Sequence, residues 1–376
     1  MKILALLSLI GWLYVTASRA LWRGAPFLDE TEIEGPQAWP EVVAVVPARN
    51  EADVIARAVR SLIGQNYQGR LSIVVVDDES TDGTADAARH AGAVDVISGT
   101  ALPEGWTGKL WALDTGVRHG SAAHPDASFF WFTDADIEHS SDELRNLAAL
   151  SEARRLDLAS IMVKLACETF WDRLLIPAFV FFFQKLYPFH QVNNPKSHTA
   201  AAAGGSMLVR RMALDRIGGL AAIKGELIDD CALAREIKRG GPIWLGLTES
   251  THSLRSYGSL RAICDLVART AYHQLRYSPL ALAGTVIAMA LLYAVPPLAI
   301  VLGSTGAFFL GAIAWVLMVW NYRPTLRLYG QSPWRSLLLP IAGVLYALFA
   351  LDSALRHWQG RGGAWKARYY PPRPQA

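Results

Sequence analysis

Two aspartates separated by one residue, Asp134 and Asp136, directly follow a run of large apolar residues at 128–133. Such a run predicts a buried strand, so the two carboxylates lie at a strand end. Carboxylates arranged in this way can hold Mg²⁺ or Mn²⁺ through oxygen ligands, and such a cation typically bridges to the phosphates of a substrate. Acidic pairs of this kind are common, and it is the position after a strand that makes this pair a candidate metal site.

A second acidic group, with Asp77, Asp78 and Asp82, follows another apolar run. The spacing from Asp78 resembles an EF-hand calcium loop, but the twelfth loop position is Arg89, where that loop requires glutamate. An EF-hand is therefore excluded. Two interpretations stay open: these carboxylates contact a ligand, or Asp82 and Gly83 only form a turn that begins the next helix.

These motifs require elements that bring strand ends together. Apolar runs at 42–46 and 71–76 alternate with helix-like stretches at 52–63 and 81–90. This alternation predicts a parallel sheet, in which ligands bind beyond the carboxyl ends of the strands. The sequence contains neither GxGxxG after the first strand nor GxxxxGK[ST] anywhere, which excludes the dinucleotide fingerprint and the P-loop.

The composition excludes other classes of protein. Only 18% of the 376 residues are charged and 52% are hydrophobic, whereas an ordinary soluble domain has about 25% charged residues. The formal net charge of +3 is too small to indicate a nucleic-acid partner. The cysteines, Cys167, Cys231 and Cys264, have neither metal nor redox spacing, which argues against a zinc site and a disulfide scaffold.

The apolar excess lies at the two ends of the chain. Residues 277–322 contain no Asp, Glu, Lys or Arg, so we expect two membrane spans of about 20 residues; a buried hairpin is the alternative. A third apolar segment, 336–351, is about 24 Å long as a helix, which is short for a span. At the N-terminus, a cleaved signal peptide fits less well than an anchor because Arg19 and Arg23 follow the apolar run.

The predicted organisation has four parts. They are an N-terminal anchor (1–24), a soluble α/β domain (36–275), a C-terminal membrane region (278–352, with spans at about 280–302 and 305–322) and a basic tail (353–376). Within the soluble part, residues 170–189 are rich in aromatic residues and too short and broken to span. They suit a segment in the membrane interface, and a buried core helix is the alternative.

The ordered motifs resemble family 2 glycosyltransferases of the GT-A fold. They are Pro47-Ala48-Arg49-Asn50-Glu51, VVVDDESTDGT, Asp134-Ala135-Asp136, Gly105-Trp106-Thr107-Gly108-Lys109, Gly204-Gly205-Ser206-Met207, Asp229-Asp230-Cys231-Ala232-Leu233 and His273-Gln274-Leu275-Arg276-Tyr277. The resemblance covers residues 42–277. The most similar subgroup is the hopanoid (hopene)-associated glycosyltransferases, and ceramide glucosyltransferases are a more distant likeness.

The resemblance implies a fold and a set of roles. The fold is a GT-A nucleotide-sugar-binding domain with a Rossmann-like mixed sheet, plus transmembrane helices at both ends. Asp134 and Asp136 would bind Mg²⁺ or Mn²⁺, and Asp230 would be the catalytic base. The implied substrate-binding residues are Pro47, Arg49, Glu51, Asp77, Asp78, Lys109, Asp134, Gly205, Asp229, His273, Arg276 and Tyr277.

Two departures and two alternatives accompany these roles. The family's EDxxL begins with Asp229 here, and its QxxRW has His273 for Gln and Tyr277 for Trp, so acceptor contacts at that motif are less secure. Lys109 could instead be a solvated loop lysine. Asp229 and Asp230 could instead only cap a helix.

The expected reaction is inverting transfer of a sugar from a nucleotide sugar, for which we expect a UDP-sugar, to a membrane lipid. The subgroup likeness suggests a hopanoid as that lipid. A processive polysaccharide synthase and a catalytically inactive membrane scaffold are the alternatives. The few C-terminal spans argue against the first, and the intact Asp134, Lys109 and Asp230 argue against the second.

The expected location is the inner (plasma) membrane of a bacterium, with the catalytic domain facing the cytoplasm. Arg19 and Arg23 follow the anchor, and Arg323, Arg327 and Arg335 precede the third apolar segment. Both groups belong on the cytoplasmic side by the positive-inside rule. Since the tail is also basic, we expect residues 336–351 to be interfacial or re-entrant.

Overall fold

The computed structural model describes the chain except residues 19–24, 31–32, 94, 362–363, 366–367 and 370–376. The chain forms two compact units, each described by itself. The sheet unit comprises Ala25–Leu165 and Phe189–Arg255, and the helical unit comprises Met1–Gly24, Ala166–Pro188 and Ser256–Ala376. The predicted soluble domain at 36–275 thus covers most of the sheet unit together with two segments of the helical unit.

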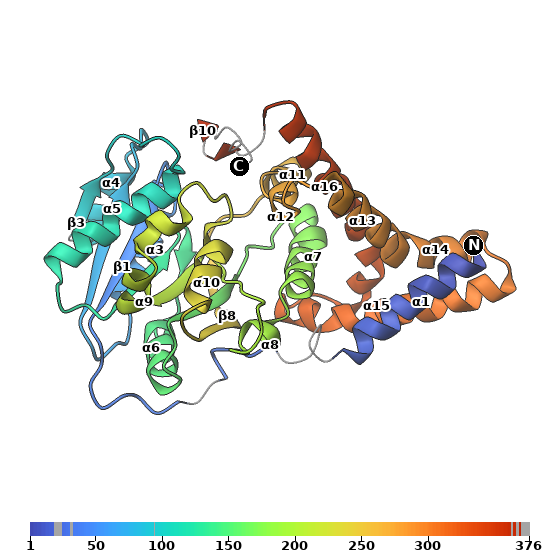
Figure 1. Cartoon of the computed structure of the whole chain (residues 1–376), viewed down its shortest axis with the longest axis horizontal. Coiled ribbons are helices and arrows are strands. Elements are labelled where there is room, and N and C mark those ends of the chain that lie inside the picture. Colours follow the sequence, from blue (N-terminus) through green and yellow to red (C-terminus); the bar gives the residue numbers. More distant parts are fainter. Residues whose placement is uncertain (19–24, 31–32, 94, 362–363, 366–367, 370–376) are drawn as a thin grey trace. The chain divides into compact units, whose positions relative to one another are not determined.

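The sheet unit is built on eight strands in the order β3-β2-β1-β4-β7-β6-β8-β5 (Figure 1). They are β1 (Val42–Ala48), β2 (Leu71–Asp77), β3 (Asp95–Ser98), β4 (Phe129–Thr133), β5 (Ile137–Glu138), β6 (Leu158–Lys164), β7 (Ser206–Arg210) and β8 (Ile243–Ser253). The strands from β3 to β4 are parallel, whereas β7 is antiparallel to both β4 and β6. The predicted mixed α/β fold is confirmed. The sequence analysis missed the short edge strand β3, so β4 is the fourth strand along the chain and not the third.

Side chains of β1 alternate between two helical layers. Val42, Ala44 and Val46 belong to a core shared with α3 (Ile55–Ile63) and α6 (Glu143–Ala153). On the other face α5 (Gly108–Ala123) approaches β1 closely at glycine, since a Cβ on Gly116 would lie only 2.3 Å from Cγ1 of Val45. This packing holds the first turn of α5 against the sheet. The unit also contains α4 (Thr84–His90), α8 (Phe189–Val192), α9 (Arg211–Arg216), the 3-10 turn Gly219–Ile223 and α10 (Asp229–Lys238).

The parallel register brings the carboxyl ends of three strands to one edge. Ala48 of β1 lies opposite Asp77 of β2, and Val45 of β1 lies opposite Phe132 of β4. The ends of these strands and the loops after them contain three charged motifs found in the sequence: Arg49-Asn50-Glu51, Asp77-Asp78 and Asp134-Ala135-Asp136. Parallel sheets bind ligands at this edge.

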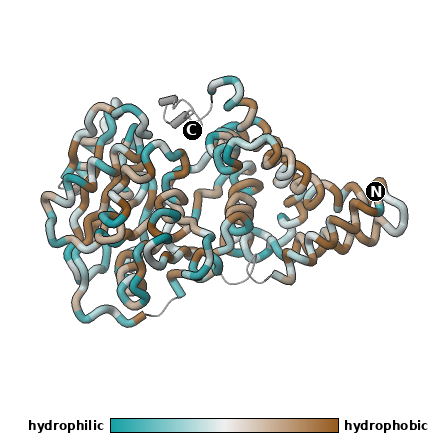
Figure 2. The backbone as a smooth tube through the Cα atoms, viewed as in Figure 1, coloured by the Kyte–Doolittle hydropathy of each residue, from teal (hydrophilic) through white to brown (hydrophobic). Residues whose placement is uncertain are grey.

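The helical unit contains the apolar ends of the chain (Figure 2). Its helices are α1 (Lys2–Ala17), α7 (Phe170–Leu186), α11 (Leu260–Ala268), α12 (Ala271–Gln274), α13 (Pro279–Met289), α14 (Val295–Leu302), α15 (Thr305–Leu328) and α16 (Leu339–Trp358), with a small ladder of β9 (Ala364–Trp365) and β10 (Arg368–Tyr369). Three helical stretches of the described residues are long and apolar enough to cross a membrane: Pro279–Leu302, Thr305–Leu328 and Pro333–Trp358.

The first two stretches agree with the predicted spans at 280–302 and 305–322. The apolar segment predicted at 336–351 is part of a longer helical stretch, which extends on both sides to 26 residues, so its predicted length is wrong. The prediction is bounded by the charged residues Arg335 and Asp352, and the helical stretch continues past both. At the N-terminus α1 has 16 residues, and the remainder of the predicted anchor, 19–24, lies outside the described residues.

A hydrogen bond from α1 satisfies a backbone carbonyl at the junction between α13 and α14. Five residues of π-helix, Ala290–Ala294, join the two helices and precede Pro296 and Pro297. Because neither proline has an N–H, the carbonyl of Leu292 lacks a helical donor at both the α and the π spacing. The indole Nε1 of Trp12 donates to that carbonyl at 2.8 Å.

Most of the segment predicted at 170–189 is the helix α7 (Phe170–Leu186), which begins with a capping box made by Thr169 and Asp172, and Phe189 begins α8. Leu175 and Phe181 are buried, and the hydroxyl of Tyr346 donates to the carbonyl of Leu175 at 2.9 Å. This packing within the helical unit favours the buried-helix interpretation for one face of α7. Its location in a membrane interface stays a prediction.

Candidate active site

Lys109, in the first turn of α5, joins two acidic motifs of the sheet unit. Its Nζ lies 2.7 Å from Oδ1 of Asp134 and 3.4 Å from Oδ2 of Asp229, and its side chain is 21% exposed. Burial alone would lower the pKa of Lys109, but the two carboxylates outweigh burial and raise the pKa above its usual value. A solvated loop lysine does not have these contacts, so that interpretation is wrong.

Asp230 lies beside this ion pair, in the first turn of α10. Its Oδ2 accepts a hydrogen bond from the N–H of Gly204 at 2.9 Å, and its Oδ1 accepts one from the N–H of Cys231 at 2.7 Å. Burial, and then the negative charge of Asp229, raise the pKa of Asp230 to about 6, although Lys109 acts in the opposite direction. A carboxylate with such a pKa can take up a proton near neutral pH.

The helix-cap interpretation of the acidic pair fits poorly. The N-cap position of α10 is Ile228, and no side-chain cap hydrogen bond is found there among the described residues. Asp229 points its buried Oδ2 toward Lys109 and has no hydrogen-bond partner for that atom in the described part of the chain. Asp229 therefore faces the lysine, and Asp230 faces the Gly204 backbone.

Asp136 lies near a charged pair from two other loops. Oγ of Ser253 donates to Oδ2 of Asp136 at 3.2 Å. Glu51, from the loop after β1, forms an ion pair with Arg255. Burial and the charge of Glu51 raise the pKa of Asp136, while Ser253 and Arg255 oppose the shift.

The loops after β1 and β2 are tied together by Arg49 and Asp82. Nη1 of Arg49 donates to the carbonyl of Asp78 at 2.5 Å. The Asp82 carboxylate accepts from the N–H groups of Ala52 and Thr84, each at 3.1 Å. The turn at Asp82 is thus confirmed, but it does not account for Asp77, whose buried Oδ1 has no hydrogen-bond partner among the described residues.

Two other predicted site residues are buried parts of the sheet edge. Pro47 is buried within β1 opposite Val76. Gly205 precedes β7, and a Cβ there would lie 2.8 Å from Cγ2 of Val163. Both shape the backbone at the site, and neither offers a side chain with polar atoms.

The last predicted motif lies in the helical unit. His273 is in α12, and Arg276 and Tyr277 follow it with φ of 53° and 55°. Two consecutive non-glycine residues in the left-handed region are uncommon. The ring of Tyr277 stacks on His357 with centroids 4.3 Å apart, and Gln274 Nε2 donates to the hydroxyl of Tyr187 at 2.6 Å.

Asp134 and Asp136 fit a divalent cation that is held mainly by a phosphate ligand. In the described residues no group of three or more His, Cys, Asp and Glu side chains could hold a metal ion. Mg²⁺, however, is ordinarily bound by one or two carboxylates, with substrate phosphates and water completing its shell. Burial of negative charge raises the pKa values of both the Asp134 and the Asp136 carboxyl groups. A bound cation would offset that charge and so favour the ionised carboxylates.

The sequence analysis missed three participants: Gly204, Ser253 and Arg255. Gly204 lay within a quoted motif, but its N–H has no sequence signature. Ser253 ends β8 and Arg255 lies two residues further on, in no recognised pattern, and only the pairing of β5 with β8 brings them to Asp136.

Comparisons with known proteins agree with the geometry. Residues 43–218, which include most of the sheet unit, match the family model "Glycosyl transferase family 2". A solved mannosyltransferase from Pyrobaculum calidifontis, in complex with GDP-Man and Mn²⁺, is 19% identical with a TM-score of 0.58. The match covers 94% of this chain and 98% of that one, and it shows the same fold.

Curated relatives share a shorter region. The 4,4'-diaponeurosporenoate glycosyltransferase of Staphylococcus haemolyticus is 32% identical over 116 residues, which are 30% of this chain and 29% of the relative. Its counterpart in Staphylococcus aureus strain USA300 is 38% identical over 95 residues, 25% of this chain and 23% of the relative. The chain therefore matches less than a third of the length of these relatives.

Proposed function

We propose that the protein is an inverting glycosyltransferase that moves a sugar from a nucleotide sugar to a lipid acceptor in a membrane. The observation that carries the proposal is the contact of Lys109 with Asp134 and Asp229, beside Asp230, at the ligand-binding edge of the sheet. This arrangement places a cation and a base candidate together. The family 2 domain match and the shared fold support it.

The proposed chemistry is a single displacement. The acceptor hydroxyl forms a bond to the anomeric carbon while the bond from that carbon to the diphosphate oxygen breaks. Asp230 takes the hydroxyl proton, and Lys109 offsets the charge that develops on the departing diphosphate. A Mg²⁺ or Mn²⁺ ion held by Asp134 and Asp136 would supply further positive charge at the diphosphate. One displacement inverts the configuration at the anomeric carbon.

The remaining predicted residues have supporting roles in this proposal. Arg49, Glu51, Asp77 and Asp78 lie in loops at the same sheet edge and would surround the base and ribose of a UDP-sugar. We propose contacts to the acceptor for His273, Arg276 and Tyr277.

A lipid-like acceptor is supported by two observations. The helical unit has three stretches able to cross a membrane, and the curated relatives are named for glycosylation of 4,4'-diaponeurosporenoate. Within this class we propose a hopanoid, on the sequence resemblance.

We also propose that the protein is in a bacterial inner membrane with the sheet unit in the cytoplasm, and that Pro333–Trp358 is re-entrant. If Pro279–Leu302 and Thr305–Leu328 cross as a hairpin, the start of the first and the end of the second lie on one side. Pro333–Trp358 begins soon after that end. Near its own end, Arg356 forms an ion pair of 2.7 Å with Asp265, which precedes the hairpin. Both ends of Pro333–Trp358 therefore belong on the same side of the membrane. For this reason we propose that the stretch is re-entrant, although it is long enough to span.

Reporter fusions test this topology. A reporter after residue 376 should be active only in the cytoplasm, like one placed in the sheet unit. Periplasmic activity of the terminal fusion would show that Pro333–Trp358 crosses.

The function is tested by incubating the purified full chain with labelled UDP- and GDP-sugars, Mn²⁺ and bacterial lipid extract. The proposal predicts a lipid bearing one added sugar, and none in excess chelator. A polysaccharide product would indicate a processive synthase, and no product with any donor would indicate a scaffold.

A further inference from the structure

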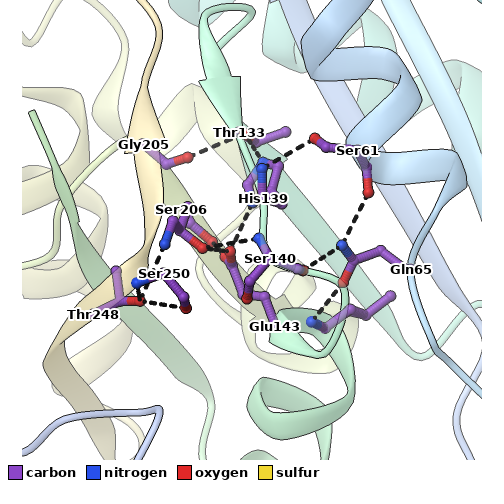
Figure 3. Close-up of polar contacts among 12 residues, drawn as sticks. Ser61, Gln65, Thr133, His139, Ser140, Glu143, Gly205, Ser206, Thr248 and Ser250 are labelled. Atoms are coloured by element: carbon purple, nitrogen blue, oxygen red, sulfur yellow. Dashed lines mark hydrogen bonds and ion pairs between the residues drawn. The ribbon is translucent and has the colours of Figure 1, made fainter. Parts of the chain in front are cut away.

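A buried polar cluster lies within the sheet unit, and Figure 3 shows its hydrogen bonds. Its side chains are Thr133, His139, Glu143, Ser206 and Thr251, each no more than 5% exposed. Thr133 ends β4, His139 follows β5, Glu143 begins α6, Ser206 begins β7 and Thr251 lies near the end of β8. The proposed reaction uses none of them directly.

The hydroxyl groups of the cluster have fixed hydrogen-bond directions. Oγ of Ser206 accepts from the indole N–H of Trp131 at 2.9 Å and donates to Oε1 of Glu143 at 2.5 Å. Oγ1 of Thr251 accepts from the N–H of Ser140 at 3.2 Å and donates to Oε2 of Glu143. Glu143 is therefore an acceptor in both contacts, as an ionised carboxylate must be.

His139 connects Glu143 to Thr133. Nδ1 of His139 lies 2.9 Å from Oε2 of Glu143 and donates to it, because an ionised carboxylate can only accept. Nε2 of His139 lies 2.7 Å from Oγ1 of Thr133, and that oxygen also lies 3.0 Å from the carbonyl of Gly205. Removing one partner of this buried pair leaves the other without its hydrogen bond.

Residues of the cluster or their partners lie one or two positions along the chain from Asp134 or from a residue that holds Asp230 or Asp136. Thr133 directly precedes Asp134. Gly205 follows Gly204, whose N–H holds Asp230. The third connection runs through Thr251, which is two residues before Ser253 on β8, and Ser253 donates to Asp136.

We propose that the His139–Glu143 pair is a positioning element that fixes the metal-binding carboxylates and the base relative to one another. This inference rests on the proposed function. The pair contacts β4 through Thr133, β7 through Ser206 and β8 through Thr251. Each contact lies close along the chain to a proposed functional carboxylate or to a residue that holds one. Since a misplacement of about 1 Å can cost about 10²-fold in rate, loosening the pair should reduce metal–nucleotide affinity and turnover beyond any loss of stability.

The test uses the full chain and four variants. Glu143→Gln keeps the shape of the side chain but turns an N–H toward groups that are themselves donors. Thr251→Val removes one of those donors, and Thr251→Ser keeps it as the matched control. Val59→Ala, in a buried position of α3 outside the cluster, is the control for stability alone.

Mn²⁺ binding in the presence of UDP or GDP is measured by electron paramagnetic resonance, together with melting temperature, KM and kcat. We expect Glu143→Gln and Thr251→Val to weaken Mn²⁺–nucleotide binding at least about five-fold and to lower kcat at least about ten-fold. Thr251→Ser should stay within about two-fold of wild type, and Val59→Ala should change only the melting temperature.

Two outcomes overturn the inference, and they differ. If the wild type binds Mn²⁺–nucleotide and Thr251→Val binds it equally well, losing only melting temperature, the cluster has a structural role and the proposed function stands. If the wild type binds neither UDP nor GDP with Mn²⁺, the proposed function itself fails. Should Glu143→Gln not fold, the Thr251→Val and Thr251→Ser pair decides.

Discussion

Glu143 in the sheet unit and the Leu292 carbonyl in the helical unit are both acceptors that depend on donors distant in sequence. Glu143 accepts from three side chains, those of His139, Ser206 and Thr251. Leu292 accepts one neutral hydrogen bond from Trp12, which replaces a donor removed by proline. The acceptor in the sheet unit is thus part of a buried network that includes an ionised side chain, whereas the acceptor in the helical unit has a single neutral donor.

The difference follows from what each acceptor must do. At Leu292 a neutral donor is enough, because the requirement is to satisfy one backbone carbonyl where water is excluded. The sheet unit must hold several carboxylates of like charge near one another, which requires compensating cations such as Lys109 and fixed donors. Removing the charge of Lys109 should therefore affect function, whereas removing the Trp12 donor should affect only stability.

The largest effect on nucleotide-sugar binding is expected from Lys109→Met. Asp134 and Asp229 lose their shared cation, and the diphosphate loses a partner. Charged hydrogen bonds contribute about 1.5–3 kcal/mol, so nucleotide-sugar affinity should fall roughly 10–100-fold in calorimetric titration. Arg118→Met is the control, since Arg118 is an exposed cation further along the same helix. Unchanged affinity in Lys109→Met would remove the lysine from the donor site.

A smaller, graded effect is expected from pH. The raised pKa of Asp230, about 6, reflects burial and Asp229, opposed by Lys109. A base must be ionised, so kcat/KM should fall about ten-fold per pH unit below that value. A profile that stays flat down to pH 5 would contradict the role of Asp230.

The same group makes a signed contribution to stability. Its pKa is near 3.9 in an unfolded chain, so between about pH 4 and pH 6 the native state binds more protons than the unfolded state. The contribution of Asp230 to the free energy of unfolding therefore decreases as pH rises through this range. Denaturant titrations of wild type and Asp230→Asn should show this slope only in the wild type.

The sequence analysis could find the parts of the site that recur at strand ends. Asp134, Asp136, Lys109 and Asp230 lie in local motifs, and the parallel register predicts that such motifs share one edge. The His139–Glu143 pair could not be found in this way. His139 and Glu143 are only four residues apart, but each is ordinary in its own segment. The partners that make them a cluster, Ser206 and Thr251, lie far along the chain and give no sign of the contact.

The helical unit shows the same limit. Charge-free runs located the hairpin, but the third stretch was judged by its uncharged core alone, and its helix continues past Arg335 and Asp352. The bond from Trp12 to Leu292 could not be predicted either, because a tryptophan in an apolar helix gives no sign of its partner.

The smallest effect is expected from Trp12→Phe. The Leu292 carbonyl loses its donor while the aromatic contact with Tyr293 is largely kept. An unpaired buried acceptor costs about 1–3 kcal/mol, so the melting temperature in detergent should fall while nucleotide binding is unchanged. Trp320→Phe, at an exposed position of α15, should leave both unchanged. Equal melting temperatures for Trp12→Phe and wild type would show that the hydrogen bond is dispensable.

The most direct test of the central claim is Asp230→Asn in the sugar-transfer assay, with nucleotide diphosphate binding measured on the same preparation. General-base catalysis typically contributes about 10²–10⁴-fold. The proposed mechanism predicts that turnover falls by about that factor while nucleotide affinity stays near that of wild type, because Asp230 contacts the acceptor and not the diphosphate. Near-normal turnover with only a lower melting temperature would contradict it and would make Asp229 the next candidate for the base.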